Sequence, residues 1–264
     1  MHVGRQVLGK ALCLLMFSAN FFAQPVQVRY REGSVHGFLS LSTLEGKLLA
    51  SGDLIQKVHG DRIEVRTTFH FKDGSLDDEQ AVFSQRGNFK LISDHHVQKG
   101  PAFPTPMDVM IEAATGQVTV RYEDDHKEKV ESEHLDLSPD VANGVLLSLL
   151  KNVPSESNQM KFDYVAATPK PRLVHLNVTR EGEATFDIVG AEHKATHFRL
   201  KVEIGGISGA IAPLVGKQPK DIEVWILQGD IPAFARLQGS LYPEGPEWII
   251  QLAAPTSFKP ETGR

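Results

Sequence analysis

Alternation of apolar and polar residues is the dominant pattern along this chain. From Ile63 to Phe71, every second residue is apolar or threonine, and the residues between them are charged, threonine or histidine. A period of two places one side of a strand in the core and the other side in water. Similar runs recur at 117–122, 184–188 and 196–204, a spacing typical of antiparallel sandwiches and barrels. The pattern therefore predicts a mainly β protein.

Short polar segments with glycine separate many of these runs and predict turns, because glycine adopts positive φ at little cost. The segments are 59–61, 72–74, 86–88, 115–116 and 181–182. Two other runs, Ile222–Leu227 and Trp248–Leu252, are almost continuously apolar. We expect these two to be buried on both faces or to lie at a seam between sheets.

One segment, Leu137–Pro154, has a helical pattern and predicts an α-helix over about 138–152. Ser138 suits the N-cap, Pro139 suits the first helical position, and Asp140 complements the helix dipole. Lys151 falls in the last turn, Asn152 can adopt the left-handed conformation, and Pro154 cannot continue the helix. Gly144 is a weak point that can separate the first turn. The apolar stripe comprises Val141, Val145, Leu146, Leu149 and Val153, and it must be buried.

Two arrangements fit these elements. In the first, one large curved antiparallel sheet or incomplete β-barrel carries the helix as a cap; in the second, two β lobes meet near 154–158. We favour the first, with a single domain at 25–255 and a frayed tail at 256–264, because β domains of this size are common. The Gly/Pro-rich segment Gly205–Pro219 predicts a loop of roughly 15 residues, which is longer than usual and typical of functional or mobile loops.

The N-terminus resembles a secretory signal peptide. Basic residues precede an apolar run from Ala11 to Phe17 that continues weakly to Ala23. We expect residues 1–23 to be the signal, cleaved after Ala19 or Ala23. The alternative is an N-terminal anchor, but the run is well short of the roughly 20 apolar residues of a membrane span. A signal peptide is therefore favoured, and the mature chain is expected to have no transmembrane segment.

Composition places the mature chain in a bacterial periplasm or outside the cell. The only cysteine, Cys13, lies in the apolar run, so the mature chain has no disulfide, no thiolate nucleophile and no Cys-ligated zinc. Export without disulfides fits a bacterial envelope protein better than a eukaryotic secreted one. The net charge of −5 does not suggest nucleic acid or an anionic membrane surface as a partner.

Histidine and acidic clusters are the candidates for metal or catalytic chemistry. His193 and His197 have the spacing of zinc ligands on a helix, but on a strand they stand roughly 13 Å apart and cannot share a metal. His95 and His96 point to opposite faces of an extended chain, and we interpret them as surface residues. The acidic stretch 123–133 lacks the spacing and glycine of a calcium loop, so we interpret it as a solvated hairpin.

Catalysis by paired carboxylates or by an activated serine is not supported either. Asp77-Asp78-Glu79 offers carboxylates, but adjacent residues point apart on a strand, so we interpret this segment as a surface turn. No G-x-S-x-G motif is present, and Gly205–Gly209 is too irregular for a phosphate-binding loop. We therefore assign no catalytic residue, no metal site and no cofactor.

Apolar surface remains as the candidate for binding. A curved sheet capped by an amphipathic helix can enclose an apolar cavity, although the same side chains can simply fill the core. The predicted ligand-binding residues lie on strand faces and on the helix stripe: Phe69, Phe71, Val145, Leu146, Leu149 and Phe198.

Three segments carry a resemblance to uncharacterised bacterial envelope families built on a half-open β-barrel, similar in architecture to periplasmic lipoprotein carriers. They are Val28–Gly33 with His36-Gly37, Leu137–Pro154, and Asp221–Trp225. The resemblance implies fold and compartment, and it carries over no catalytic residue. The leading hypothesis is a non-enzymatic exported protein that binds an apolar or lipid-like ligand. The alternatives are an envelope interaction or scaffold module that binds another envelope protein, and a hydrolase with an unrecognised site.

Overall fold

The computed structural model describes residues 25–125, 127–166, 169–203, 219–253 and 256–260. These residues form fifteen antiparallel strands in one sheet and a single short helix, which confirms the predicted mainly β fold. The strands of the first half are β1 (Val35–Thr43), β2 (Leu48–His59), β3 (Arg62–Phe71), β4 (Leu76–Ser84), β5 (Lys90–Lys99), β6 (Met107–Glu112), β7 (Gln117–Asp124) and β8 (Lys127–His134). After α1 (Leu146–Asn152) come β9 (Gln159–Ala166), β10 (Arg172–Ile188), β11 (Ala191–Glu203), β12 (Ile222–Leu227), β13 (Ala233–Gly239), β14 (Trp248–Leu252) and β15 (Thr256–Pro260).

The sheet is continuous but open. Its order is β15-β10-β11-β12-β13-β14-β1-β2-β3-β4-β5-β6-β7-β8, and β9 pairs with β10 beside β15. The pairing of β14 with β1 joins the two halves of the chain, with Leu41 opposite Ile250. Strands on both sides of 154–158 therefore belong to one sheet. The ends of the sheet are β8 on one side, and β9 and β15 on the other.

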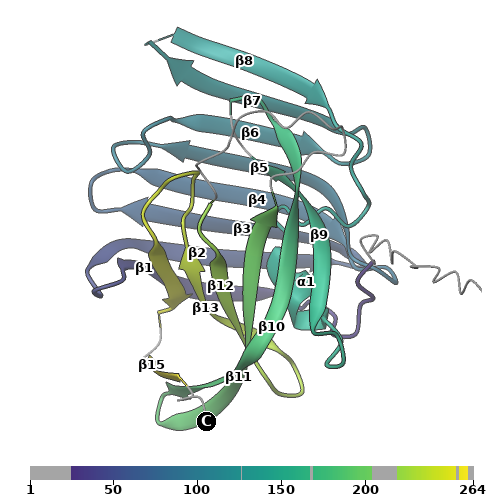
Figure 1. Ribbon diagram of the computed structural model, residues 1–264, viewed down its shortest axis with the longest axis vertical. Helices are drawn as coiled ribbons and strands as arrows, with labels where there is room; N and C mark the ends of the chain where they lie inside the picture. The colour runs from purple at the N-terminus through teal and green to yellow at the C-terminus, as the bar shows by residue number, and fades with distance from the viewer. Residues whose placement is uncertain (1–24, 126, 167–168, 204–218, 254–255, 261–264) are drawn as a thin grey trace, which may run out of the picture.

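The sheet curves so that its two halves face each other, with α1 between them (Figure 1). One core cluster joins Ile63 of β3 and Phe83 of β4 to Leu149 of α1, Phe162 of β9 and Leu200 of β11. The helix is therefore enclosed by the curve. The prediction that its apolar stripe is buried is confirmed: Val141, Val145 and Leu149 are at most 1% exposed, Val153 is 9% exposed, and Leu146 packs against the same cluster.

The predicted helix bounds of 138–152 are wrong at the N-terminal end. The helix begins only at Leu146, its N-cap is Val145, and no side chain caps it. Gly144 has a φ of +63°, a left-handed conformation that interrupts helical geometry. Ser138 and Asp140, expected to cap the helix and to complement its dipole, instead precede it. Asp140 is buried and Ser138 is partly buried, and their Oδ2 and Oγ atoms have no hydrogen-bond partner. Asn152, expected beyond the helix, is its last residue.

The segment between β8 and α1 covers the free edge of β9. The backbone N–H of Ala142 donates to the Asp163 carbonyl at 2.8 Å. The Asn143 side chain accepts a hydrogen bond from the Val165 N–H at 2.7 Å and donates to the Val165 carbonyl at 3.0 Å. An amide side chain thus takes the place of a neighbouring strand. The seam of the curved sheet is filled by irregular chain, which protects an edge from pairing with other molecules.

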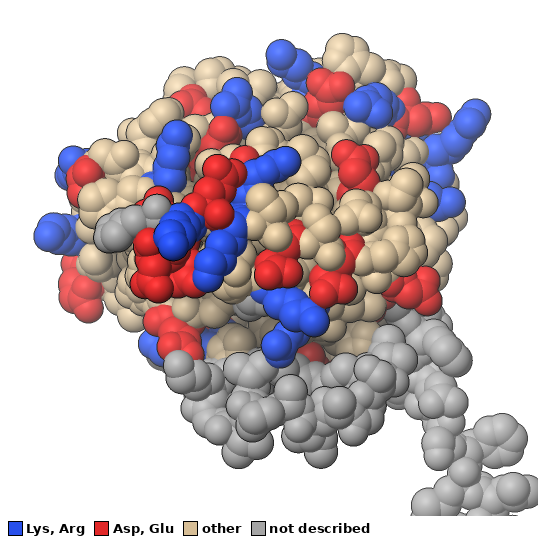
Figure 2. All heavy atoms as spheres, turned by 90° about the horizontal axis from the view of Figure 1, so that it is seen from above, with Lys and Arg blue, Asp and Glu red and all other residues tan. Residues whose placement is uncertain are grey.

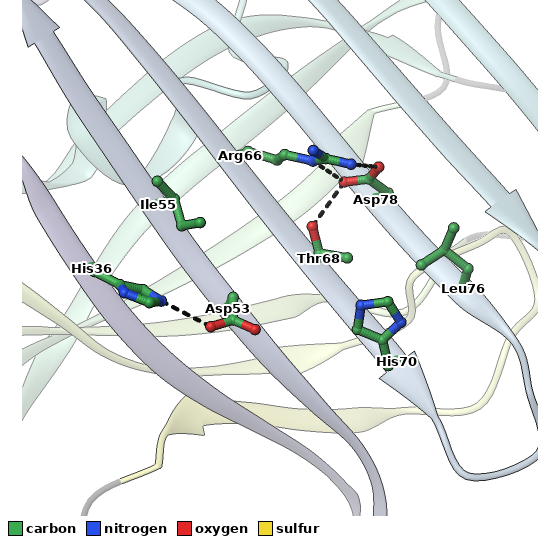
Figure 3. Close-up of a pocket in the computed structure, with 8 residues that line it drawn as sticks. All are labelled: His36, Asp53, Ile55, Arg66, Thr68, His70, Leu76 and Asp78. Atoms are coloured by element: carbon green, nitrogen blue, oxygen red, sulfur yellow. Dashed lines mark hydrogen bonds and ion pairs between the residues drawn. The ribbon is translucent and has the colours of Figure 1, made fainter.

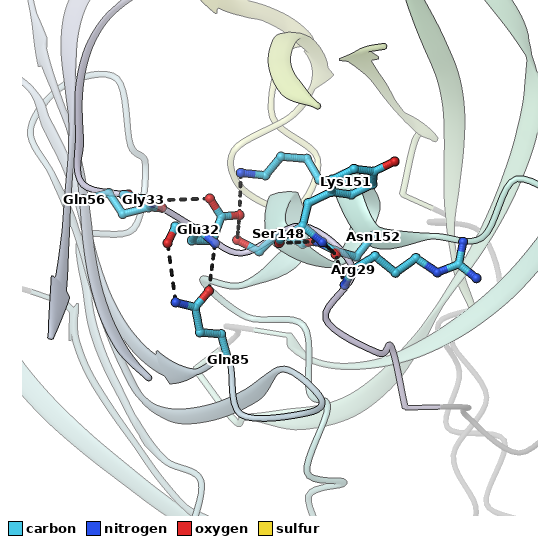
Figure 4. Close-up of polar contacts among 9 residues, drawn as sticks. Arg29, Glu32, Gly33, Gln56, Gln85, Ser148, Lys151 and Asn152 are labelled. Carbon is cyan, nitrogen blue, oxygen red and sulfur yellow. Dashed lines mark hydrogen bonds and ion pairs between the residues drawn. The ribbon is translucent and has the colours of Figure 1, made fainter. Parts of the chain in front are cut away.

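A buried ion pair ties the N-terminal segment to the helix (Figure 4). Lys151 Nζ lies 2.5 Å from Glu32 Oε1, and the two side chains are 16% and 8% exposed. Ser148 Oγ donates to the same carboxylate at 2.6 Å, and Gln56 Nε2 donates to its second oxygen at 3.1 Å. Asn152 Oδ1 accepts the backbone N–H groups of residues 29 and 30, each at 2.7 Å.

Other predictions have mixed outcomes. The runs Ile222–Leu227 and Trp248–Leu252 coincide with β12 and β14, and buried residues on both faces confirm the expectation. Gly182 lies at a bulge inside β10 and not in a hairpin turn. Part of the expected frayed tail forms β15, which pairs with β10. The signal peptide and almost all of Gly205–Pro219 lie outside the described residues.

The acidic stretch 123–133 belongs to the exposed hairpin of β7 and β8, as predicted. Nearly every residue of β8 is exposed, and five of its eight residues are charged: Lys127, Glu128, Lys129, Glu131 and Glu133. Acidic and basic side chains are intermixed on the face that Figure 2 shows, which is the face above β8 in Figure 1. Charged edge strands of this kind resist pairing with another sheet.

Candidate functional site

The six predicted ligand-binding residues lie in the core and divide between two clusters. Phe198, Val145 and Leu149 belong to the cluster around α1, and Leu146 packs against it. Phe69 and Phe71 belong to a second cluster with Trp248. Leu149 is fully buried, and Val145, Phe198, Phe69 and Phe71 are 1%, 2%, 2% and 8% exposed, so their surfaces are already covered by protein. The structure therefore does not bring the six together around one site.

Other apolar side chains that pack against these clusters are only partly buried. Val65 of β3, Leu147 of α1, Tyr164 of β9 and Leu237 of β13 contact the core clusters yet keep accessible surface. Leu147 and Leu237 contact both of the clusters described above. These side chains lie where the two halves of the sheet meet the helix. We call these four side chains the apolar wall. Of the six predicted residues, only Leu146 is partly accessible in the same way.

Polar side chains on β4 and β5 face the same interior. Asp77 and Glu79 alternate with the outward-facing Asp78, and cross-strand pairing sets Asp77 opposite Gln98 and Glu79 opposite His96. One pair further along, Ala81 stands opposite Asp94. Because residues two apart share a face of a strand, the four ionisable groups lie side by side. We call Asp77, Glu79, Asp94 and His96 the interior acid cluster.

Hydrogen bonds fix one end of this cluster. His96 Nε2 lies 3.2 Å from Asp77 Oδ2, and Gln98 Nε2 donates to the same oxygen at 2.7 Å. Gln98 also donates to the carbonyl of Leu241 at 3.0 Å, which ties the cluster to the chain after β13. The Asp77 side chain is 6% exposed and the His96 side chain is 24% exposed. His96 is thus the more accessible member of this pair.

At the other end of the cluster, not every carboxylate oxygen has a hydrogen-bond partner. The Gly144 N–H donates to the Glu79 carboxylate. Asp94 is only 2% exposed, and its Oδ1 has no hydrogen-bond partner. A Cβ atom added at Gly144 would lie 2.9 Å from that oxygen and 2.2 Å from the Ala81 Cβ, so the chain before α1 packs directly against the acids. Only glycine fits this position.

Burial and mutual interaction perturb the protonation of the cluster. Burial raises the pKa of Glu79, and burial together with the charge of Glu79 raises the pKa of Asp94 well above its usual range. For His96, burial opposes protonation, but the hydrogen bond to Asp77 and the charges of the three acids outweigh it and raise the pKa to about 9. His96 is therefore protonated at neutral pH. Burial and the nearby carboxylates also raise the pKa of Tyr164.

The surface interpretation is wrong for Asp77, Glu79 and His96, whereas the His95 side chain is exposed as predicted. Asp77-Asp78-Glu79 lies within a strand and not in a turn, and Asp77 and Glu79 share its inner face. His95 and His96 do point to opposite faces, as expected: His95 pairs with Asp108 at 3.0 Å outside, and His96 faces the acids. The acidic partners stand on the neighbouring strand, which local spacing does not reveal. One sequence signal could have indicated the cluster: Asp77 and Glu79, and likewise Asp94 and His96, are two residues apart and so share one face of a strand.

A depression of about 390 Å³ on the outer face of β1 to β4 is the second candidate (Figure 3). Its polar groups mostly pair with one another. Arg66 donates to both oxygens of Asp78, at 2.8 and 2.7 Å, and His36 Nε2 lies 2.9 Å from Asp53 Oδ1. These pairs are exposed to water and leave few groups to recognise a ligand. The interior acid cluster, with a buried and unpaired carboxylate oxygen, is the stronger candidate.

Comparisons with protein-family models, curated proteins and solved structures give no significant match. Among the described residues, no helix has the length and apolar character needed to cross a bilayer. In the same part of the chain, no three His, Cys, Asp or Glu side chains are arranged to hold a metal ion. Functional inference therefore depends on the geometry of the interior.

Proposed function

We propose that this protein is an exported, non-enzymatic β protein that binds an apolar or lipid-like ligand between α1 and the inner face of β3 to β5. The observation that carries the proposal is a set of side chains that pack against the core cluster around α1 yet keep accessible surface: Val65, Leu147, Tyr164 and Leu237. Of these, Tyr164 interacts with the acid cluster. Ligand sites combine mostly apolar walls with a few convergent polar groups, and this region has both. The signal-like N-terminus and the resemblance to periplasmic carriers support a role in a bacterial envelope.

Filling this space tests the proposal. Leu147→Trp adds an indole where the wall is accessible, and Leu44→Trp places the same group in an exposed turn, where Leu44 is 47% exposed. The uncharged dye 1-N-phenylnaphthylamine serves as an apolar probe, and its fluorescence reports binding. We expect wild type and Leu44→Trp to bind alike and Leu147→Trp to lose at least about tenfold in affinity. Equal binding by all three folded proteins would contradict the proposal, as would a complete lack of binding by wild type.

A scaffold role is less well supported by the described residues. The long Gly/Pro-rich segment Gly205–Pro219, a candidate interaction loop, lies almost wholly outside them. The exposed edge strand β8 carries five charged residues, which oppose strand addition. Recovery of one specific envelope protein by crosslinking from intact cells would favour this role.

A hydrolase is favoured only by the convergence of His96 with Asp77 and Glu79. A general base must be unprotonated at the working pH, but a histidine whose pKa is about 9 carries its proton at neutral pH. Binding is therefore the better use of this geometry. Hydrolysis of a nitrophenyl ester that disappears in Asp77→Asn would reverse this preference.

A further inference from the structure

We propose that the interior acid cluster recognises a protonated amine, so that the ligand of this protein carries an organic ammonium group at one end of its apolar part. This inference rests on the proposed function and specifies the ligand's chemical class. It follows from the charge balance of the cluster, from one unpaired buried oxygen, and from the apolar wall next to them.

The charge balance favours a cation. Asp77, Glu79 and Asp94 supply three carboxyl groups, and His96 supplies one positive charge. Among the described residues, the charged groups that act on Glu79 are His96 and Asp77, and those that act on Asp94 are Glu79 and His96. No lysine or arginine is among them. Glu79 and Asp94 have raised pKa values and so retain protons more readily than free carboxyls, and an added cation would take the place of those protons.

The unpaired oxygen shows where a donor is missing. Asp94 Oδ1 is buried without a hydrogen-bond partner, and native proteins leave few such atoms unsatisfied. An ammonium group carries three N–H donors and no acceptor, which matches a group of carboxylate oxygens. A carboxylate or phosphate ligand would instead lie next to three acids and could pair with only one cation, the imidazolium of His96. An anionic headgroup is therefore disfavoured.

The neighbouring wall explains why the amine should carry an apolar chain. Val65, Leu147 and Leu237 are partly accessible apolar side chains packed against the core around α1, and none of them can hydrogen-bond. An alkylamine places its head among the acids and its chain along this wall. A small inorganic cation would leave the wall empty, and the described acids have no arrangement suited to a metal ion.

Proton linkage gives the site a recognisable signature. The acids that face the ligand are Asp77 and Glu79 from β4 and Asp94 from β5, with His96 of β5 and Tyr164 of β9 beside them. Burial raises the pKa of Glu79 and of Asp94, so these groups bind protons more tightly than free carboxyls do. An ammonium ion competes with those protons. Its affinity should therefore increase as the pH rises, while that of an uncharged analogue should not.

Three probes with the same chain test the inference: dodecylamine, dodecanol and dodecanoate. Each displaces 1-N-phenylnaphthylamine from the full chain, at about pH 6 and about pH 8. We expect dodecylamine to bind at least about tenfold more tightly than dodecanol, and dodecanoate to bind most weakly. Only the amine should gain affinity at the higher pH.

Two nearly isosteric variants, Glu79→Gln and Asp94→Asn, distinguish the contribution of the ligand's head group to affinity from that of its alkyl chain. Each should reduce the preference for the amine to within about twofold while leaving dodecanol binding unchanged. Asp108→Asn, on the outer face of β6, is the matched control and should behave as wild type. Melting curves establish that each variant is folded. One folded variant of the two is sufficient to test whether the acids cause the preference for the amine.

The outcomes distinguish this inference from the proposed function. If dodecanol binds but dodecylamine is no better, or if neither folded variant changes the preference, amine recognition is overturned and apolar binding stands. If dodecanoate binds most tightly, the head group is anionic and the inference fails. If none of the three displaces the dye and the dye itself does not bind, the proposed function fails, and the inference fails with it.

Discussion

Gly144→Ala is the substitution whose effect on folding stability can be worked out most fully. Gly144 has a φ of +63°, and a left-handed conformation costs a non-glycine residue about 1–2 kcal/mol. An added Cβ would lie 2.2 Å from the Ala81 Cβ and 2.9 Å from Asp94 Oδ1. The Ala81 Cβ is attached directly to the backbone and its Cα lies 3.5 Å from the added atom, so backbone must move, and overpacking of this kind costs about 1–3 kcal/mol. The sum is roughly 2–5 kcal/mol.

Gly60→Ala is a control that isolates the contribution of the clash. Gly60 has nearly the same φ, +64°, but a Cβ added there would meet nothing within 4 Å. The control should therefore lose only the conformational part, about 1–2 kcal/mol. The difference between the two variants measures how tightly the chain before α1 packs against β4 and β5.

Urea unfolding followed by tryptophan fluorescence measures both free energies, because Trp225 and Trp248 are 6% and 5% exposed when the protein is folded. We expect Gly144→Ala to be less stable than Gly60→Ala by at least about 1 kcal/mol. A difference below about 0.5 kcal/mol would refute the close packing of Gly144 on the acid cluster. Such a result would also leave the late start of the helix without a steric cause.

Three further predictions concern the remaining buried polar contacts. Lys151→Met should lower the free energy of unfolding by about 3 kcal/mol, because it leaves Glu32 buried without its cation; adding Glu32→Gln should recover most of the loss, and urea unfolding checks both. Asn143→Ala should cost about 2–3 kcal/mol and increase hydrogen exchange at the Val165 amide, since both hydrogen bonds to the edge of β9 disappear; unchanged protection of that amide would contradict this account. His96 has a folded pKa raised from 6.5 to about 9, so its contribution to stability is complete below about pH 6.5 and is lost as the pH rises through 9. His96→Gln should flatten the decline in unfolding free energy between about pH 7 and about pH 9, and an identical pH profile for the variant would show that His96 does not cause it.

The way in which the edge strands of the sheet are protected affects the interior of the protein. A barrel abolishes its edges by closing, but this sheet stays open and protects its edges in two different ways. Strand β8 is exposed and charged, and β9 is covered by Ala142 and Asn143. Because irregular chain fills the seam, the interior is bordered by a backbone N–H at Gly144 that reaches the acids. A closed barrel would have placed a regular strand there instead.

Local patterns in the sequence predicted the mainly β fold, most of the named turns, and all or part of six strands: β3, β7, β10, β11, β12 and β14. The alternation from Ile63 to Phe71 predicted which face of β3 is buried, and the continuous runs at Ile222–Leu227 and Trp248–Leu252 match β12 and β14. These features depend on the two-residue period of a strand and on where apolar side chains avoid water, and both are properties of short segments. The burial of the stripe from Val141 to Val153 was predictable for the same reason.

The start of the helix and the acid cluster depend on contacts between distant parts of the chain. The capping pattern at Ser138 was outweighed by contacts of Gly144 with β4 and β5, which are distant in the sequence. The acid cluster exists because the pairing of β4 with β5 sets Glu79 opposite His96, and because the second half of the sheet folds over them with Tyr164. Desolvation and charge coupling depend on which distant segments exclude water from a group, and no local spacing encodes this. Short-range sequence patterns therefore established which strands form and which faces are apolar, whereas the register and curvature of the sheet determine which polar groups share its interior.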